Sequence, residues 1–210
     1  MTPFYRTLRA IVFWVLKPLM RIKVSGRENE PKKGDGPIII CCNHIAASDP
    51  IAIGIALRYV QPHFMAKSSL FKNKFVGWLL RKMGAFPVNR DGNDVAALKN
   101  TLRLLKDGKC VGIFPQGTRY PGIAPATTEV KSGVGMICGY SGATVIPVFI
   151  DTKDHTPKLL RRRTVVIGKP MTPEEIAYVP RKADEYERIS KLIFDRICLT
   201  GEEYKNSKKK

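Results

Sequence analysis

The sequence is poor in acidic residues and lacks an apolar run long enough to cross a bilayer. Asp and Glu together number 18 against 36 Lys and Arg, which leaves a net charge of +18 at pH 7. Such an excess favours partners that carry phosphate, either an anionic lipid surface or a nucleic acid. The unbroken apolar run near the N-terminus, residues 10–16, is too short for a membrane span and is not followed by the small-residue cleavage site of a signal peptide.

Cysteine and histidine are also scarce, with five and three residues respectively. The cysteines are odd in number, mostly lie in apolar runs and show no paired spacing with nearby histidines, which argues against a disulfide framework or a zinc site. We interpret them as small buried apolar residues of a reducing compartment. They are Cys41, Cys42, Cys110, Cys138 and Cys198.

The length and the apolar pattern predict one α/β domain. A chain of 210 residues suits a single core, and short apolar runs alternate with helical patterns. This alternation predicts a mostly parallel central sheet flanked by helices. Strands are expected at 21–24, 37–42, 63–66, 85–88, 110–114, 144–150 and 164–167, and helices at 49–58, 70–83, 95–106, 131–140 and 182–199. We divide the chain into an N-terminal helix (1–20), a domain (21–203) and a disordered, solvated basic tail (204–210).

The N-terminal helix is expected to be amphipathic. At helical spacing its apolar side chains gather on one face, with the basic ones opposite and Trp14 near the boundary. The apolar residues are Phe4, Leu8, Ile11, Val12, Val15 and Leu19, and the basic ones are Arg6, Arg9 and Lys17. Two interpretations are open: a helix that lies in a membrane interface, or a helix that packs on its own domain.

Polar residues directly after the predicted strand 37–42 form a candidate catalytic pair. In a sheet of this kind ligands gather at the carboxyl ends of strands, and Asn43 and His44 lie at such an end. A turn before Asp49 would let this carboxylate hold one ring nitrogen of His44 and leave the other as a general base. Alternatively, Asp49 is simply the N-cap of the helix that begins with Pro50.

Two further stretches follow later strands. Residues 84–90 lead from a glycine turn into a short strand that ends on Arg90, which suits either a forked phosphate contact or a solvent-facing position. Residues 114–119 place Pro115 and Gly117 around a tight turn, where backbone amides, Thr118 and Arg119 would cradle a phosphate. A plain surface turn explains the proline and the glycine but not the whole string.

Taken in order, these stretches resemble the signature blocks of the 1-acylglycerol-3-phosphate acyltransferase family, the bacterial lysophosphatidate acyltransferases and their glycerolipid relatives. Residues 43–49 resemble the catalytic block, 84–90 the second, 114–119 the third and 145–148 the hydrophobic fourth. Residues 64–67 and 131–133 are also similar, so the resemblance covers roughly residues 20–170. Four blocks in order at family spacing are far more specific than any one of them.

One position departs from the family pattern. The third block usually carries glutamate where this chain has Gln116, which keeps hydrogen-bonding capacity but removes a negative charge. Another lysophospholipid or an aminolipid is therefore an alternative acceptor.

The resemblance implies a one-step transfer from acyl carrier protein or acyl coenzyme A to the sn-2 hydroxyl of lysophosphatidate, which yields phosphatidate. His44 would act as the base and Asp49 would orient it. The residues that it assigns to the acceptor and its phosphate are Arg119, Gly117, Thr118, Gln116, Arg90 and Lys67. Neither a metal nor another cofactor is expected.

The basic charge and the N-terminal helix together predict a peripheral protein on the cytoplasmic face of the cell membrane, docked on anionic lipid. The arginine run 161–163 belongs either to that docking face or to a solvated turn. A nucleic-acid-binding domain is an alternative, but no recognition module is present, so no nucleic-acid partner is expected. A catalytically silent membrane protein is another, against which the intact His44, Asp49 and Arg119 argue.

Overall fold

The computed structural model describes residues 1–89, 94–158 and 160–209, except the side chains of Val12 and Phe13. Within these residues, seven strands form one sheet in the order β1-β7-β6-β2-β5-β3-β4. The strands are β1 Ile22–Ser25, β2 Ile38–Cys42, β3 Pro62–Lys67, β4 Phe86–Val88, β5 Cys110–Ile113, β6 Thr144–Thr152 and β7 Arg163–Ile167. Neighbouring strands run parallel except β6 and β7, which pair antiparallel. The predicted α/β fold with a mostly parallel sheet is confirmed.

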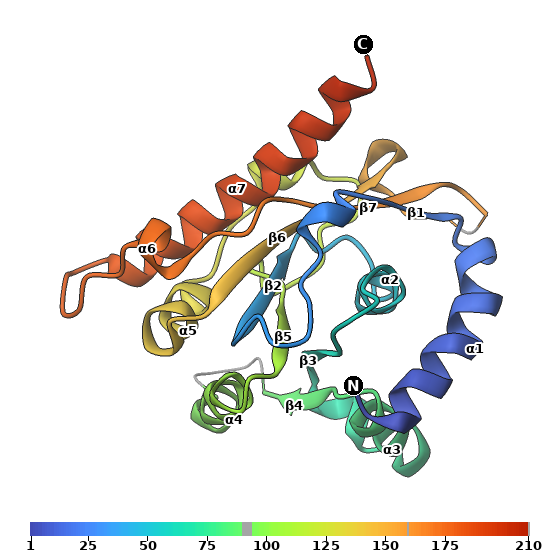
Figure 1. Ribbon diagram of the computed structural model, residues 1–210, viewed down its shortest axis with the longest axis horizontal. Helices are drawn as coiled ribbons and strands as arrows, with labels where there is room; N and C mark the ends of the chain where they lie inside the picture. The colour runs from blue at the N-terminus through green and yellow to red at the C-terminus, as the bar shows by residue number, and fades with distance from the viewer. Residues whose placement is uncertain (90–93, 159, 210) are drawn as a thin grey trace.

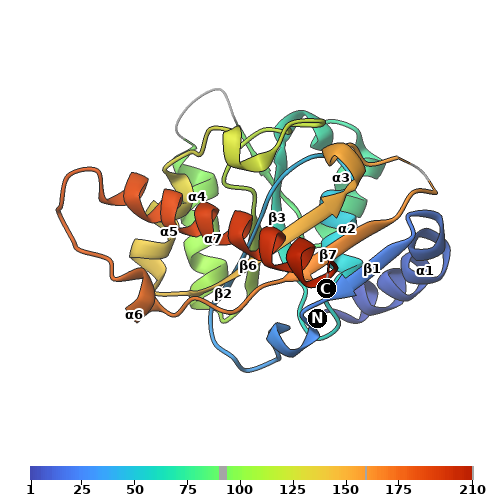
Figure 2. The ribbon, with the colours of Figure 1, turned by 90° about the horizontal axis from the view of Figure 1, so that it is seen from above.

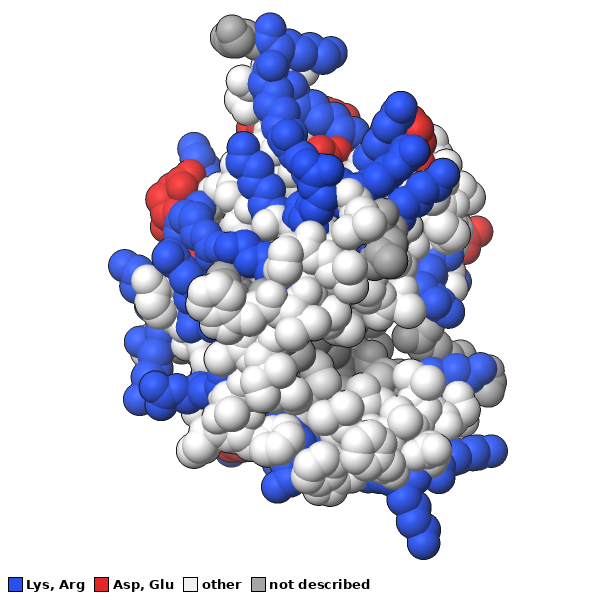
Figure 3. Space-filling model, turned by 90° about the vertical axis from the view of Figure 1, so that its right-hand side faces the viewer, with Lys and Arg blue, Asp and Glu red and all other residues white. Residues whose placement is uncertain are grey.

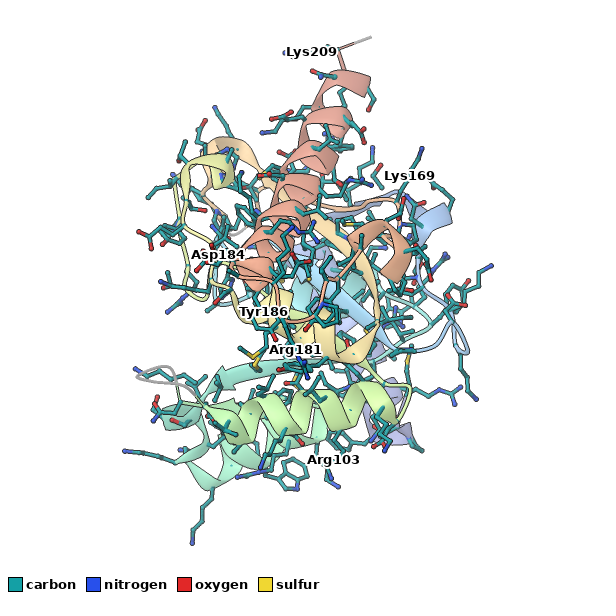
Figure 4. The ribbon with its side chains drawn as sticks, turned by 90° about the vertical axis from the view of Figure 1, so that its left-hand side faces the viewer. Arg103, Lys169, Arg181, Asp184, Tyr186 and Lys209 are labelled. Carbon is teal, nitrogen blue, oxygen red and sulfur yellow. The ribbon has the colours of Figure 1, made fainter. Side chains whose placement is uncertain are left out.

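Helices cover both faces of the sheet (Figure 1). The helices are α1 Pro3–Leu19, α2 Asp49–Ala56, α3 Lys74–Lys82, α4 Val95–Lys106, α5 Gly133–Ser141, α6 Pro173–Ile176 and α7 Glu185–Ser207, with 3-10 turns η1 Arg27–Asn29, η2 Ser68–Phe71, η3 Pro125–Thr127 and η4 Lys153–His155. α1 and α2 lie on one side, and α4, α5 and α7 on the other (Figures 1 and 2). Figure 4 shows the side that carries α4, α5 and α7. Asp184 lies at the amino end of α7, Lys209 beyond its carboxyl end and Arg103 on α4.

The core consists of two apolar clusters, one on each face of the sheet. Successive β2 side chains alternate between them, with Ile39 and Cys41 on the α7 side and Ile40 and Cys42 on the α2 side. This double burial explains why β2 reads as a continuous apolar run. All five cysteines are free thiols, and only Cys198 is not fully buried, so the interpretation as buried apolar residues holds for four of them.

The long helix α7 extends into the segment expected to be a tail. Ile189, Ile193 and Ile197 recur every fourth residue and are fully buried against the sheet. Further along, Tyr204 is also buried, and its hydroxyl donates to Oγ1 of Thr164 at 3.3 Å. The prediction of a disordered tail from residue 204 is therefore wrong for residues 204–207. The buried Tyr204 side chain holds the last turn of α7 on the domain.

The first helix packs on α2 in an orientation that its sequence pattern did not predict. Arg9 faces the domain, where Nε donates to the carbonyl of Gly54 at 3.1 Å and Nη2 to that of Ile55 at 3.4 Å. These carbonyls lie in the last turn of α2, which has no intrahelical partners for them. Ile11 and Val15 are exposed instead. Arg9, which the sequence places on the polar face of the helix, thus contacts the domain, while Ile11 and Val15 of the predicted apolar face do not.

Candidate active site

The loop after β2 is anchored to β6 by an asparagine. The side chain of Asn43 is buried; its Nδ2 donates to the carbonyl of Ile150 at 3.2 Å, and its Oδ1 accepts from the Ile150 amide at 2.7 Å. This reciprocal pair gives the chain a fixed exit from the sheet at the carboxyl end of β2. The next residue, His44, is therefore held at the edge where ligands bind in parallel sheets.

His44 and Asp49 form the contact that their spacing predicted. The distance from His44 Nδ1 to Asp49 Oδ2 is 2.9 Å, and the two residues are 6% and 0% exposed. The same Oδ2 accepts from the backbone amides of Ile45 at 2.8 Å and Ala46 at 2.7 Å. Because an ionised carboxylate only accepts, Nδ1 carries the hydrogen and Nε2 is left available as a base. The contact is confirmed, while its catalytic role stays a prediction.

The alternative interpretation of Asp49 as a helix N-cap is wrong. The N-cap of α2 is Ser48, and Asp49 is the first residue inside the helix. The Asp49 carboxylate turns back toward the loop and bonds residues 44, 45 and 46. Pro50 fits the first turn because a proline there gives up no helical hydrogen bond. The acidic residue therefore fixes the histidine loop rather than the helix end.

An aromatic stack holds the imidazole from one side. The Phe114 ring lies parallel to His44 with centroids 3.9 Å apart, and Phe64 stacks behind Phe114 at 5.6 Å. Gly112 leaves the space for Phe64, because a Cβ there would lie 2.1 Å from the Phe64 ring. The sequence placed Phe114 only at the start of the third block, and its contact with His44 was not predicted. The available signal was an aromatic residue at the end of a buried strand.

Beside the imidazole is a small cavity of about 150 Å³. Its other lining residues are Met65, Val88, Gly112, Ile113, Phe114 and Gly117. Because these groups are mostly apolar, the cavity suits an alkyl group more than a charged one. Within the described part of the chain, no three His, Cys, Asp or Glu side chains are grouped as they would be around a metal ion.

Gln116 lies behind the histidine. It is 1% exposed; its Oε1 accepts from the His44 backbone amide at 2.6 Å, and its Nε2 donates to Oγ1 of Thr128 at 2.7 Å. The amide of Tyr120 donates to the carbonyl of His44 at 2.9 Å. Residues after β5 therefore hydrogen-bond both the backbone amide and the carbonyl of His44. Both ends of the Gln116 side chain are thus used inside the protein. A direct contact of Gln116 with the acceptor stays a prediction.

The other described residues assigned to the acceptor lie at the same edge of the sheet. The predicted tight turn is confirmed: the Gly117 amide donates to the carbonyl of Phe114 at 2.9 Å, and Gly117 adopts a positive φ of 68°. Gly117, Thr118 and Arg119 are exposed after β5, and Lys67 is the exposed last residue of the adjacent β3. Arg90 lies outside the described residues. The phosphate-binding roles stay predictions.

The arginine run 161–163, which ends on the first residue of β7, divides into two environments. Arg161 and Arg162 are exposed, whereas Arg163 is 6% exposed and points inward. Its Nη1 lies 3.7 Å from Oδ1 of Asp49 and donates to Oγ of Ser48 at 2.9 Å. Burial lowers the pKa of the Arg163 guanidinium, and Asp49 opposes that effect. The expectation that Arg163 belongs to a surface run is therefore wrong, and sequence reasoning missed its place at the dyad.

Comparisons with known proteins place the chain among acyltransferases. The family model described as Acyltransferase matches residues 21–151. The 1-acyl-sn-glycerol-3-phosphate acyltransferase of Bacillus subtilis is 34% identical over 77% of this chain and 79% of its own length. The enzyme of the same name from Streptococcus pneumoniae is 28% identical over 98% of this chain and 77% of its own length.

The fold is also shared with a solved structure. The crystal structure of the 1-acyl-sn-glycerophosphate (LPA) acyltransferase PlsC from Thermotoga maritima matches with a TM-score of 0.63 and 23% identity, over 94% of this chain and 83% of that one. The region that the family model matches contains the dyad and both described cationic candidates, Lys67 and Arg119. The chain belongs to the acyltransferase family.

Proposed function

We propose that the protein transfers a fatty acyl group from a thioester to the sn-2 hydroxyl of 1-acylglycerol-3-phosphate, which forms phosphatidate. The observation that carries the proposal is the buried His44, whose Nδ1 is held by Asp49 while the ring borders an apolar cavity. The relatives from Bacillus subtilis and Streptococcus pneumoniae, both named for this acceptor, support its choice. Each aligns with most of this chain.

The proposed reaction needs one base and one step. Nε2 of His44 removes the proton from the acceptor hydroxyl as its oxygen attacks the thioester carbonyl carbon, and the carbon–sulfur bond then breaks. The resulting imidazolium returns the proton to the leaving thiolate. Asp49 supports the imidazolium, and a positioned base of this kind contributes about 10² to 10⁴ in rate. The step uses no acyl-enzyme, metal or redox cofactor, and amides of the turn after β5 are candidates to stabilise the oxyanion.

The acceptor phosphate would bind to the cationic side chains at the same edge. Arg119 offers a forked guanidinium that matches two phosphate oxygens, and Lys67 ends the neighbouring strand. Arg90 is a third candidate from the sequence. Since β2, β5 and β3 are adjacent, His44, Arg119 and Lys67 come from neighbouring positions along one edge.

A basic cavity beside β7 suits the acyl donor. The cavity of about 450 Å³ includes Arg21, Lys153, Arg161 and Arg162 in its lining. Asp151 also lines it, but Lys205 and Lys208 approach that carboxylate at 3.9 and 3.8 Å. Acyl coenzyme A and acyl carrier protein both present phosphate groups, and the carrier protein adds an acidic surface, so we propose that one of these donors docks here.

An uncharged face on the α1 side is the proposed membrane contact. Trp14 on α1 and Phe75 on α3 are 78% and 71% exposed, and Ile11 and Trp78 add further exposed apolar surface. The two helices meet where Phe4 packs edge-on against Trp78 at 5.6 Å. Figure 3 shows uncharged side chains over this side, bordered by Lys and Arg. Such a face suits peripheral docking on an anionic bilayer, at the cytoplasmic side.

No helix within the described residues combines the length and apolarity needed to cross a membrane.

The docking proposal predicts that liposomes with anionic lipid bind the protein and that Phe75→Glu together with Trp78→Glu weakens binding. Lys99→Glu, an exposed change of charge on α4 in the opposite layer, is the control. Equal loss of binding in the control would point to net charge alone.

The proposed acceptor is tested with purified protein, mixed liposomes and labelled acyl thioesters. Lysophosphatidate should yield labelled phosphatidate, and acyl carrier protein and coenzyme A donors are compared in parallel. Arg161→Glu with Arg162→Glu should raise KM for the preferred donor without changing KM for the acceptor. Product with another lysophospholipid and none with lysophosphatidate would contradict the proposed acceptor. No product with any acceptor would contradict the proposed function.

A further inference from the structure

We infer that Arg163 is a positioning residue for the catalytic dyad: its buried guanidinium holds the Asp49 carboxylate in place and keeps a fixed positive charge on the side of that carboxylate away from His44. The inference rests on the proposed transferase reaction, in which His44 is the base. It starts from the position of Arg163 Nη1, 3.7 Å from Oδ1 of Asp49 and 2.9 Å from Oγ of Ser48.

The two oxygens of the Asp49 carboxylate have different surroundings. Oδ2 accepts from the imidazole and from two backbone amides, those of Ile45 and Ala46. Oδ1 is buried and has no hydrogen-bond partner among the described residues. Its charged neighbour is Arg163. Burial of a carboxylate is unfavourable unless a positive charge compensates it, so the guanidinium is needed on the side away from the histidine.

The backbone of Arg163 fixes where the guanidinium lies. Arg163 is the first residue of β7, and its Cα is paired with Thr152 of the antiparallel β6 and with Ile22 of the parallel β1. A residue with strands on both sides cannot easily move along the sheet. The bond to Ser48 then joins β7 to the loop between His44 and α2. Arg163 therefore supports that loop from a strand far away in the sequence.

The charged and titratable groups that face Asp49 come from three places. His44 comes from the loop after β2, Arg163 from β7 and the Cys42 thiol from the end of β2. Burial, and after it the Asp49 charge, raises the pKa of Cys42 well above its ordinary value, so this thiol is neutral. Arginine keeps its charge even when buried. Arg163 is thus the permanent cation of the group.

The proposal predicts a specific change in pH dependence. Arg163→Met removes the charge and keeps an unbranched side chain. The loss of a neighbouring cation favours protonated His44, so the acid limb of kcat/KM should move to higher pH by about half to one unit. The misplaced carboxylate should lower kcat by about tenfold or more, with KM for lysophosphatidate little changed. Arg163→Lys restores the charge without the fork, so it should return the acid limb toward the parent position while kcat recovers only in part.

Matched controls separate this role from general stability. Arg103→Met removes an exposed arginine on α4, in the layer on the other side of the sheet, and should leave the pH profile unchanged. Far-ultraviolet circular dichroism and urea unfolding establish that each variant is folded. If Arg163→Met does not fold, Arg163→Lys and Ser48→Ala carry the test, since Ser48→Ala removes only the bond to Oγ and should lower kcat without moving the acid limb.

A titration of His44 followed by NMR makes the test independent of turnover. The His44 signal is assigned with His44→Gln, and its titration midpoint should be higher in Arg163→Met than in the parent and intermediate or parental in Arg163→Lys. An unchanged midpoint in folded Arg163→Met would overturn the inference. If the parent forms no product with any donor or acceptor, the proposed function fails, and a shifted midpoint would still establish the coupling between Arg163 and His44.

Discussion

Replacement of Asp49 with asparagine keeps the shape of the side chain and removes its charge. In the structure Oδ2 accepts from three donors, at 2.9 Å from His44 Nδ1 and at 2.8 and 2.7 Å from the amides of Ile45 and Ala46. Asparagine has one oxygen and one NH₂ group. If the oxygen takes the place of Oδ2, the NH₂ group faces the Arg163 guanidinium, donor against donor; if the amide is flipped, the NH₂ group faces all three donors.

The magnitudes follow from this conflict. Loss of one partner of a buried ion pair typically costs about 3 to 5 kcal/mol, and the 3.7 Å separation from Arg163 places Asp49→Asn at the lower end, about 3 kcal/mol. In catalysis the imidazolium would lose its supporting charge, so kcat should fall by about 10² to 10⁴. KM for lysophosphatidate should change little, because Asp49 is fully buried and does not reach the acceptor.

Initial rates of phosphatidate formation between pH 7 and 9, at several acceptor concentrations, separate kcat from KM. Urea unfolding of the same preparations measures the change in the free energy of unfolding. Folded Asp49→Asn with kcat within threefold of the parent would refute the dyad. A large rise in KM with kcat unchanged would instead place Asp49 in acceptor binding.

Two substitutions and one labelling experiment test the surroundings of the site and the rest of the fold. Gly112→Ala would put a methyl group 2.1 Å from the Phe64 ring, so the stack on His44 must shift, and urea unfolding should show a loss of about 1 to 3 kcal/mol together with lower kcat. A hydrogen bond from Arg188 lowers the pKa of Glu185 from 4.5 to about 2. The stability that the ionised Glu185 provides is therefore present above pH 4.5 and lost as the pH falls toward 2, and Glu185→Gln should be less stable at pH 7 and lose that part of the pH dependence of urea unfolding. Because burial raises the pKa of buried Cys138 to about 12 and that of the half-buried Cys198 to about 11, a disulfide reagent should label the native protein slowly and at Cys198 first, and rapid labelling of Cys138 would contradict the buried core.

The fold was largely predictable because most elements carry a local signal. The strand 110–114 and the helix 95–106 were expected almost at their observed bounds, since apolar runs of strand length and helical periodicity depend on nearby residues. The strand order and the antiparallel β6–β7 pair are set by contacts between distant segments, which no local pattern carries. The sequence left the orientation of α1 open, because the pattern of apolar and basic residues does not reveal which side of the helix faces its domain.

In the site, too, contacts within one loop were predictable and contacts between distant segments were not. His44 and Asp49 are five residues apart, so one loop brings them together and their spacing was informative. Phe114, directly after β5, stacks on the imidazole, and Arg163, in β7, approaches the Asp49 carboxylate; the bond between Arg163 and Ser48 spans 115 residues. In the sequence Arg163 is one of three consecutive arginines, a pattern typical of a solvated turn. What separates it from its two neighbours is that β7 begins at Arg163, whereas Arg161 and Arg162 precede the strand and are exposed.

The base role of His44 is tested by a comparison of two histidine variants. Phosphatidate formation from lysophosphatidate and an acyl thioester is followed for the parent, His44→Ala and His63→Ala. His63 lies near the amino end of β3, where its Nδ1 contacts the carbonyl of Cys110, away from the edge that carries the dyad. We predict that kcat/KM falls at least about a hundredfold in folded His44→Ala and stays near the parent value in His63→Ala. Comparable activity in His44→Ala and the parent would contradict the account, because the transfer would then proceed without the imidazole.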